Sequence, residues 1–399
     1  MPRRSSVFAV MLLCLSHCVV SQTFHPDSSL RYTAYQNSCG EWGGIYFQER
    51  GGNHRIVLQI YNLRSCSMDV LMSGIRSMGN WDGLHNPDRI NPFFDKVDRD
   101  SAFALYRQLY GDRVLSLTNG VFFEAPTETS YTKLAYPLQY GGVLLSAGAS
   151  PFGPRGGKYP LKVLQANDSL VRILDYDYAT GLPMRDAGYP NQIATLNYRD
   201  HPNIKEFPDM AGGYKARYHL ITALDYDATP GSETIVILSS NFDLTICELA
   251  EEMKLLHKSI RDENILTLDG GSSISVQDMN GVDIIAPDRG VKVPMYIGFR
   301  LKEGGNGEGP TIMNPRSGER INAGHPYFMF YFSKDGIADC MLLHNGAPVG
   351  RLVDPGAALH KGLFVWDPFR CANGSDYQVW MRSASGKVTI SAPFAVERW

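Results

Sequence analysis

The chain has 399 residues, of which 44% are hydrophobic and 20% are charged, and its net charge is −3. This length favours two domains over one, because single hydrophobic cores stop growing at a few hundred residues. Binding to nucleic acid requires a clustered basic surface, and the sequence shows no such cluster. We therefore predict no nucleic-acid partner.

The first residues are typical of a secretory signal peptide. A short basic segment, MPRRSS, precedes the apolar run VFAVMLLCL, and small residues lie just before Gln22. We expect residues 1–21 to be removed and the mature protein to be secreted or to lie in the lumen of the secretory pathway. An uncleaved anchor is the alternative, although the run is short for a span. No later run reaches the ~18 apolar residues of a spanning helix, so no membrane span is predicted.

Two helices are predicted in the first three quarters of the chain. Residues 98–112 place apolar side chains at helical spacing, and an apolar run follows them. Residues 243–260 form a second amphipathic pattern, in which Thr245 and Glu248 have the spacing of a capping box. Runs rich in β-branched and large aliphatic residues flank this second helix. The order strand, helix, strand favours an α+β fold with a mixed sheet, and it places Asp269 at the carboxyl end of the later strand.

The composition changes at residues 302–314, where glycines and a proline interrupt the pattern. We expect a linker there, between an α+β domain at residues 22–301 and a second domain at residues 315–399. The second domain contains only short strand-like runs separated by turn signals such as NG and DPG, a texture that predicts an antiparallel β-sandwich. Within the first domain, residues 174–213 are rich in Pro, Tyr and Asp and form either a lid over a site or a plain surface loop.

Five cysteines remain once the signal peptide is removed. Cys340 and Cys371 share the C-terminal domain and are the first candidates for a disulfide, with Cys39 and Cys66 as a second pair. Cys247, inside the second predicted helix, is then left as a buried inert thiol. Two N-glycosylation acceptors agree with a secretory route, namely Asn167 and Asn373.

The segment TLDGGSS, residues 267–273, combines the residue types of a ligand site. Glycines let a ligand approach the backbone amides, serine hydroxyls hold oxyanions, and a carboxylate binds a sugar or moves a proton. A tight turn of purely structural function is the alternative, since the same residues favour turns. The segment is neither a phosphate-binding Walker loop nor a GxSxG nucleophile elbow, and the chain has no HExxH motif. We therefore predict no cofactor and no metal.

Four segments in order along the chain point to a known family. These are SLTNGVFFE at 116–124, KARYHLITALD at 215–225, LTICELAEEM at 244–253 and LTLDGGSSISV at 266–276. Together they resemble the phosphodiester glycosidase family. That family includes the enzyme that removes N-acetylglucosamine from the phosphodiester precursor of mannose 6-phosphate. The resemblance implies a secreted hydrolase that cleaves a sugar-1-phosphodiester on a glycan or a cell-surface polymer.

The resemblance also implies a site. Asp269 is the expected principal catalytic residue, and Glu124 is the second carboxylate that glycoside cleavage commonly uses. Arg217 would hold the negative charge of a phosphodiester through its guanidinium. The alternatives without a catalytic or binding role are a surface cation for Arg217 and a solvated strand-end residue for Glu124. The other residues expected to bind substrate are Asn119, Gly120, Phe123, Gly270, Gly271 and Ser273.

Two positions depart from the family pattern. Val121 and Ser272 stand where the family has glycine, and a side chain at either position would narrow the pocket. This departure motivates the alternative of a catalytically silent, secreted carbohydrate-binding or matrix protein on the same fold. The C-terminal domain, in turn, resembles the immunoglobulin-like repeat of fungal cell-wall glucan-synthesis proteins, which implies an accessory β-sandwich.

Overall fold

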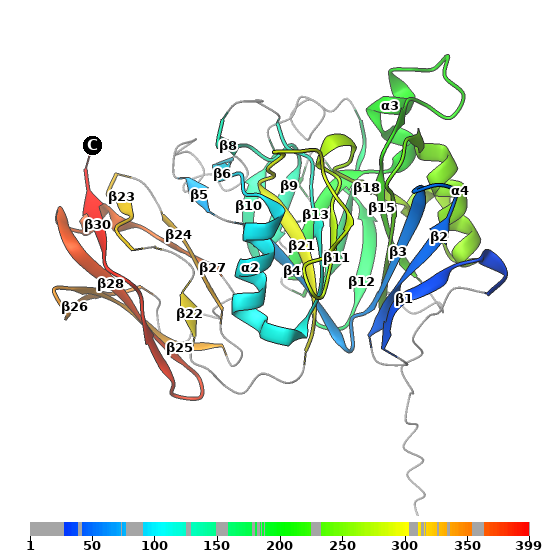
Figure 1. Cartoon of the computed structure of the whole chain (residues 1–399). Helices are drawn as coiled ribbons and strands as arrows, with labels where there is room; N and C mark the ends of the chain where they lie inside the picture. The colour runs from blue at the N-terminus through cyan, green and yellow to red at the C-terminus, as the bar shows by residue number, and fades with distance from the viewer. Residues whose placement is uncertain are drawn as a thin grey trace, which may run out of the picture.

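The computed structural model describes residues 28–38, 42–72, 74–76, 91–124, 129–148, 159–177, 180–181, 184, 186, 188–224, 233–302, 310–312, 315, 317–324, 327–332, 336–352 and 363–398 (Figure 1). The predicted signal peptide, Cys39 and most of the predicted linker lie outside these residues. Strand β22 (Thr311–Ile312) falls within the range predicted as linker and already belongs to a C-terminal sheet.

The described part of the chain is mostly β, with 49% strand and 15% helix, so the predicted α+β fold with a mixed sheet is wrong. The error arises at the strands that flank the second helix, β16 (Thr234–Ser240) and β18 (Leu266–Leu268). Both strands are in one sheet, but β15 (His219–Leu224) lies between them and pairs antiparallel with each. Because β15 comes from earlier in the chain, the order strand, helix, strand does not produce a parallel pair.

Up to Leu301, the described strands form three larger sheets in which neighbouring strands are antiparallel. Sheet I has the order β1 (Thr33–Ser38), β2 (Gly43–Glu49), β3 (Arg55–Asn62), β16, β15 and β18. Sheet II has the order β20 (Asp283–Ile285), β19 (Val276–Asp278), β7 (Val114–Asn119), β21 (Met295–Leu301) and β4 (Cys66–Met72). Sheet III has the order β10 (Val143–Ala147), β9 (Pro137–Tyr140), β13 (Asn191–Leu196), β11 (Leu161–Ala166) and β12 (Val171–Asp175). Shorter strands are β5 (Ile75–Arg76), β6 (Phe93–Asp95), β8 (Tyr131–Thr132), β14 (Lys215–Ala216) and β17 (Leu244–Thr245).

Helices cover the outer faces of sheets I and II, and the two sheets share an apolar core between them (Figure 1). Both long helices were predicted, and their caps explain their starts. Asp98 accepts a hydrogen bond from the Ser101 amide at the start of the helix on sheet II, and Thr245 and Glu248 form the predicted capping box on sheet I. The helices are α2 (Arg99–Tyr110), α3 (Pro202–Lys205) and α4 (Ile246–Leu256), with 3-10 turns η1 (Ser28–Leu30), η3 (Gly111–Arg113), η4 (Tyr198–Asp200), η5 (Asp262–Asn264), η6 (Gly271–Ser273) and η7 (Pro368–Arg370).

A line of fully buried polar side chains crosses the core between sheets I and II. The Tyr61 hydroxyl donates to Gln59 Oε1 at 2.9 Å and lies 2.5 Å from Ser116 Oγ, while Gln59 Nε2 donates to Thr118 Oγ1 at 3.2 Å. Each polar group therefore has a partner, as burial requires. Asn119, the last residue of β7, is also fully buried.

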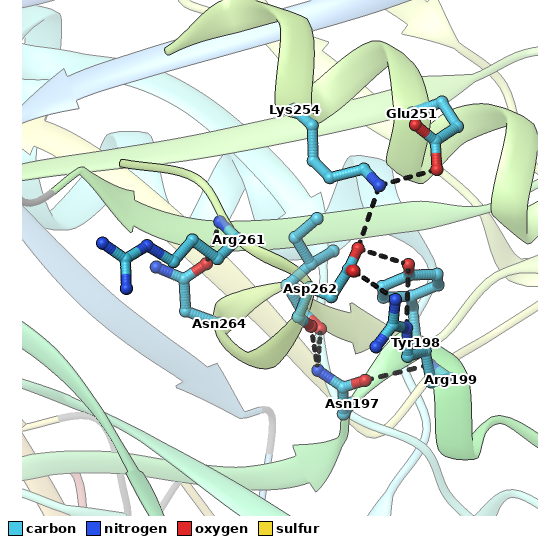
Figure 2. Close-up of polar contacts among 9 residues, drawn as sticks. Asn197, Tyr198, Arg199, Glu251, Lys254, Arg261, Asp262 and Asn264 are labelled. Atoms are coloured by element: carbon cyan, nitrogen blue, oxygen red, sulfur yellow. Dashed lines mark hydrogen bonds and ion pairs between the residues drawn. The ribbon is translucent and has the colours of Figure 1, made fainter. Parts of the chain in front are cut away.

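Figure 2 shows a second polar cluster, which joins η4, α4 and η5 at the start of β18. Asp262 is its centre: the carboxylate accepts from the Tyr198 hydroxyl at 2.7 Å, pairs with Lys254 at 3.0 Å, and also pairs with Arg199. Asn197 Nδ2 donates to the backbone oxygen of Asp262 at 2.6 Å. The hydrogen bond from Tyr198 and these cations hold the pKa of Asp262 below its usual value.

The C-terminal strands form two sheets around a separate apolar core, at the left in Figure 1. One pair, β23 with β30, is parallel, and the remaining described pairs are antiparallel. One sheet contains β22, β24 (Tyr327–Phe332) and β27 (Leu363–Trp366). The other contains β23 (Arg320–Asn322), β30 (Phe394–Glu397), β28 (Gly374–Ser383), β25 (Ile337–His344), β26 (Ala347–Arg351) and β29 (Val388–Ile390).

The predicted disulfide between Cys340 and Cys371 is not formed. Both residues are free thiols that pack in or against the C-terminal core, where they act as small apolar side chains. Cys66 and Cys247 are free as well. In the part of the chain that the structure describes, no helix has the length and apolar character needed to cross a membrane.

Candidate functional site

Three segments far apart in the sequence meet at one end of sheets I and II. They are the end of β7, the residues just before β15, and the turn that follows β18. The Asp269 amide donates to Gly120 O at 2.9 Å, Asn119 Nδ2 donates to Asp269 O at 2.7 Å, and the Gly271 amide donates to Arg217 O at 2.8 Å. The structure therefore brings together most of the residues that the resemblance implied.

Close packing favours glycine at two positions of the site, and backbone conformation favours it at a third. A Cβ atom on Gly120 would lie 2.3 Å from Met295 Cε, and one on Gly270 would lie 2.6 Å from Arg217 O. Gly271 has a φ of 63°, in the left-handed region that favours glycine. Gly120 and Gly270 thus allow neighbouring segments to approach closely, and Gly271 allows the turn, so each glycine has a structural reason for its presence.

Asp269 is half-buried at the centre of this junction. Its Oδ2 atom makes a short hydrogen bond with Ser273 Oγ, which also lies 2.9 Å from Gly270 O. Burial raises the pKa of Asp269 from 3.8 to about 7, although contacts with Ser273, Gly270 and Asn119 oppose the rise. The Ser273 hydroxyl has one proton but lies within hydrogen-bond distance of two oxygen atoms, Asp269 Oδ2 and Gly270 O. When Asp269 is protonated, its carboxyl can donate to Ser273 Oγ, and the Ser273 hydroxyl can then donate to Gly270 O. The carboxyl can therefore both give and take a proton near neutral pH.

A buried histidine that the sequence analysis missed holds Asn119 in place. His219, the first residue of β15, places Nε2 2.7 Å from Asn119 Oδ1 and Nδ1 2.5 Å from Ser239 Oγ. Asn119 Oδ1 also accepts from the Ser275 amide at 2.8 Å, so the oxygen is the acceptor and His219 carries its proton on Nε2. Burial lowers the pKa of His219 to about 3, so the imidazole is neutral at physiological pH. The available signal was a lone histidine within the apolar run YHLITAL.

Arg217 lies beside the turn but does not contact the Asp269 carboxyl in the described contacts. Its guanidinium donates to Asp288 Oδ1 at 2.7 Å, and its side chain is 18% exposed. Asp288 is 59% exposed, so the pair lies at the surface. The Arg217 side chain thus pairs with a surface carboxylate, while its backbone oxygen accepts from the Gly271 amide and forms part of the junction.

The segment after Gly120 leads away from Asp269. Phe123 packs against the cluster under α2, and the Glu124 amide donates to Lys133 O at 3.0 Å. Among the described contacts, none joins Glu124 to Asp269. Val121 is buried in the main core, and Ser272 is exposed at the rim of the turn. The two departures from the family pattern therefore lie in different surroundings, one in the core and one at the surface.

The two predicted glycosylation acceptors differ in access. Asn167 Nδ2, the atom that would carry a glycan, donates to Gly188 O at 3.1 Å, and Asn167 Oδ1 accepts two backbone amides of the β11–β12 turn. Asn373 is exposed, and its described hydrogen bond uses Oδ1, which accepts from the Arg398 amide at 3.1 Å. Asn373 is therefore the more accessible acceptor.

Comparisons with known proteins give little guidance to function. No family model and no curated protein matches the chain. Among solved structures, a hypothetical protein from Synechocystis is similar with a TM-score of 0.36 at 14% identity, covering 65% of this chain and 62% of its own. The fibronectin(III)-like modules of Clostridium thermocellum CbhA are similar with a TM-score of 0.17 at 19% identity, covering 23% of this chain and 46% of their own. Likenesses this weak place the chain in no family.

Proposed function

We propose that the protein is a hydrolase of sugar-1-phosphodiesters and that Asp269 is its catalytic residue. The convergence of three distant segments on the backbone of one turn, whose Asp269 carboxyl is half-buried, supports the proposal most directly. A structural turn needs no such junction, whereas a catalytic carboxyl must be fixed in position and kept partly free of solvent. The nearby guanidinium of Arg217 has the charge and the geometry to bind a phosphodiester.

In this proposal Asp269 acts as a general base. Its carboxylate takes a proton from water as the water oxygen bonds to C1 of the sugar and the bond between C1 and the phosphate oxygen breaks. The products are the free sugar and a phosphate monoester. Because phosphate leaves as a stable anion, the leaving group needs no proton from a second carboxylate, and the separation of Glu124 from Asp269 is not an obstacle. Arg217 balances the charge that grows on the departing phosphate.

The test is hydrolysis of α-N-acetylglucosaminyl and other sugar-1-phosphodiesters by the purified protein. Asp269→Asn should lower kcat by about 10²–10⁴-fold, the range expected for loss of a positioned acid or base. Arg217→Ala should raise KM, because the guanidinium holds the phosphodiester, and should also lower kcat, because it balances the charge that grows on the departing phosphate. Asp112→Asn is the matched control, because this carboxylate is 95% exposed on a different part of the surface.

Two outcomes would overturn the proposal. Full activity of a folded Asp269→Asn variant would mean that the reaction takes place elsewhere. Glycan binding without turnover by the unmodified protein would favour the alternative of a silent carbohydrate-binding protein on the same scaffold.

A further inference from the structure

The loop that follows α3 exposes a cluster of apolar side chains. Phe207 is 40% exposed, and Met210 and Tyr214 are each 48% exposed. The rings of Phe207 and Tyr214 are in contact, with centroids 5.5 Å apart and planes inclined by 38°. Single apolar residues on a surface need no explanation, but three exposed ones on one short loop, two of them with rings in contact, do. We name these three residues the aromatic platform.

The backbone of the loop is fixed by hydrogen bonds. The Met210 amide donates to Phe207 O at 3.1 Å, the Gly213 amide donates to Met210 O at 2.9 Å, and the Tyr214 amide donates to Asn203 O at 2.8 Å. These bonds close the loop, so that its first and last aromatic residues meet at its base. The platform is therefore held in place before any ligand arrives, which lowers the entropic cost of binding.

Tyr218 connects the platform to the candidate site. Its hydroxyl donates to Tyr214 O at 2.6 Å, while its Cα atom would lie 3.4 Å from a Cβ atom on Gly270. Tyr218 therefore lies between the loop that carries the platform and the turn that carries Asp269. Figure 1 agrees, since the loop that follows α3 projects from the same end of the molecule at which β15 begins and β18 ends.

We propose that the aromatic platform binds a sugar ring of a glycan, at a subsite beyond the one that holds the phosphodiester. A pyranose has an apolar C–H face and a polar rim of hydroxyl groups. The platform matches this pattern, because two aromatic rings lie among exposed polar residues of the same segment, Lys205, Asp209 and Lys215. A protein or membrane partner would require a larger continuous apolar surface than three side chains provide. Only the assignment of this sugar to the hydrolysed substrate rests on the proposed function.

The binding experiment uses calorimetric titration of the full unmodified chain with glycans that carry no phosphodiester, so that binding is measured without the proposed hydrolysis. The probes are mannotetraose and N-acetylchitotetraose, each compared with its monosaccharide. We expect at least one tetrasaccharide to bind and the monosaccharides to bind much more weakly. A Phe207→Ala/Tyr214→Ala variant should bind that tetrasaccharide at least about tenfold more weakly, whereas Phe369→Ala, which removes a 59% exposed ring of the C-terminal domain, should bind unchanged.

Three results would overturn the subsite: no tetrasaccharide binding by the folded protein, equal binding by the double variant, or an equal loss in the Phe369→Ala control. Kinetics separate this failure from failure of the proposed function. If the protein binds glycans through the platform but hydrolyses no phosphodiester, the subsite is supported and the proposed function is wrong. If the double variant hydrolyses glycan-linked phosphodiesters with the same KM as the unmodified protein, the proposed function is supported and the subsite is wrong.

Discussion

Asp262 and Asp269 flank the short strand β18 and have opposite surroundings. Asp262 precedes the strand and is surrounded by donors and cations, including Tyr198 and Lys254, which lower its pKa (Figure 2). Asp269 follows the strand and has a serine hydroxyl as its described side-chain partner, while burial raises its pKa to about 7. The same residue type is thus kept charged at one end of β18 and half-protonated near neutral pH at the other.

This difference separates a structural carboxylate from a chemical one. A carboxylate surrounded by cations stabilises the fold because folding strengthens its charged form. A carboxylate that is desolvated without a compensating cation destabilises the folded state. Such groups occur mainly at functional sites. Substitution of the two aspartates should therefore change stability in opposite directions.

The largest effect is expected for Asp269→Asn. The raised pKa of Asp269 means that the folded state prefers the protonated form. Its cost is therefore absent below about pH 4 and complete above about pH 7. The neutral amide removes that cost, so the variant should be more stable than the parent at pH 8, on the order of 2–4 kcal/mol, and nearly equal to it at pH 4. Urea denaturation at the two pH values measures the difference.

Equal stability of the parent and the variant at pH 8 would show that the charged Asp269 carboxylate does not destabilise the folded state. Asp262 and Asp269 would then not differ in the way proposed. The Asp112→Asn variant serves again as the control, because its side chain is exposed and its substitution should not change the pH dependence.

The next effect is expected at His219. Replacing His219 with leucine removes the described partner of Ser239 Oγ and one of the two donors to Asn119 Oδ1, which should destabilise the protein by about 2–3 kcal/mol. His219→Gln keeps an N–H donor in reach of Asn119 and should lose less. Comparison of the two variants by denaturation, together with nitrogen NMR of the His219 ring, tests whether Nε2 carries the proton. Equal losses would mean that size, and not the donor, is what the site requires.

The sequence was sufficient where local physical chemistry decides the structure. The apolar spacing of residues 98–112 predicted α2, and the pair Thr245 and Glu248 predicted the start of α4, because capping depends on neighbours within one turn. The strand order of sheet I could not be predicted from local sequence patterns. Which strand pairs with β18 depends on contacts between distant parts of the chain, and the insertion of β15 leaves no local signal.

Some residues of the candidate site were predicted from the sequence and others were not. The resemblance brought Asn119, Arg217 and Asp269 into one hypothesis, and the structure places the three segments in contact. It did not include His219, since a histidine inside an apolar strand is more often a satisfied core residue than part of a site. Glu124 was the opposite case, because proximity along the chain to Asn119 did not bring it to the carboxyl of Asp269.

A smaller effect is expected for Asp262→Asn. The lowered pKa of Asp262 means that its contribution is present above the unfolded value and is lost as the pH falls through the folded value. The variant should be less stable than the parent by about 1 kcal/mol at pH 7, since the cluster is partly solvent-exposed, and the difference should fade towards pH 3. Urea denaturation across this range measures it. The sign is opposite to that expected for Asp269→Asn, and a stabilising effect would contradict the contrast.

The smallest effect is expected for Ser273→Ala. The serine hydroxyl donates to the charged form of Asp269, so its removal should raise the pKa of that carboxyl further, by about half a unit to one unit. Carbon NMR of the Asp269 carboxyl measures this shift without reference to any substrate. A fall in the pKa would mean that Asp269 is the donor and Ser273 the acceptor, in which case the hydroxyl stabilises the protonated carboxyl and Asp269 is prepared to release a proton and not to accept one.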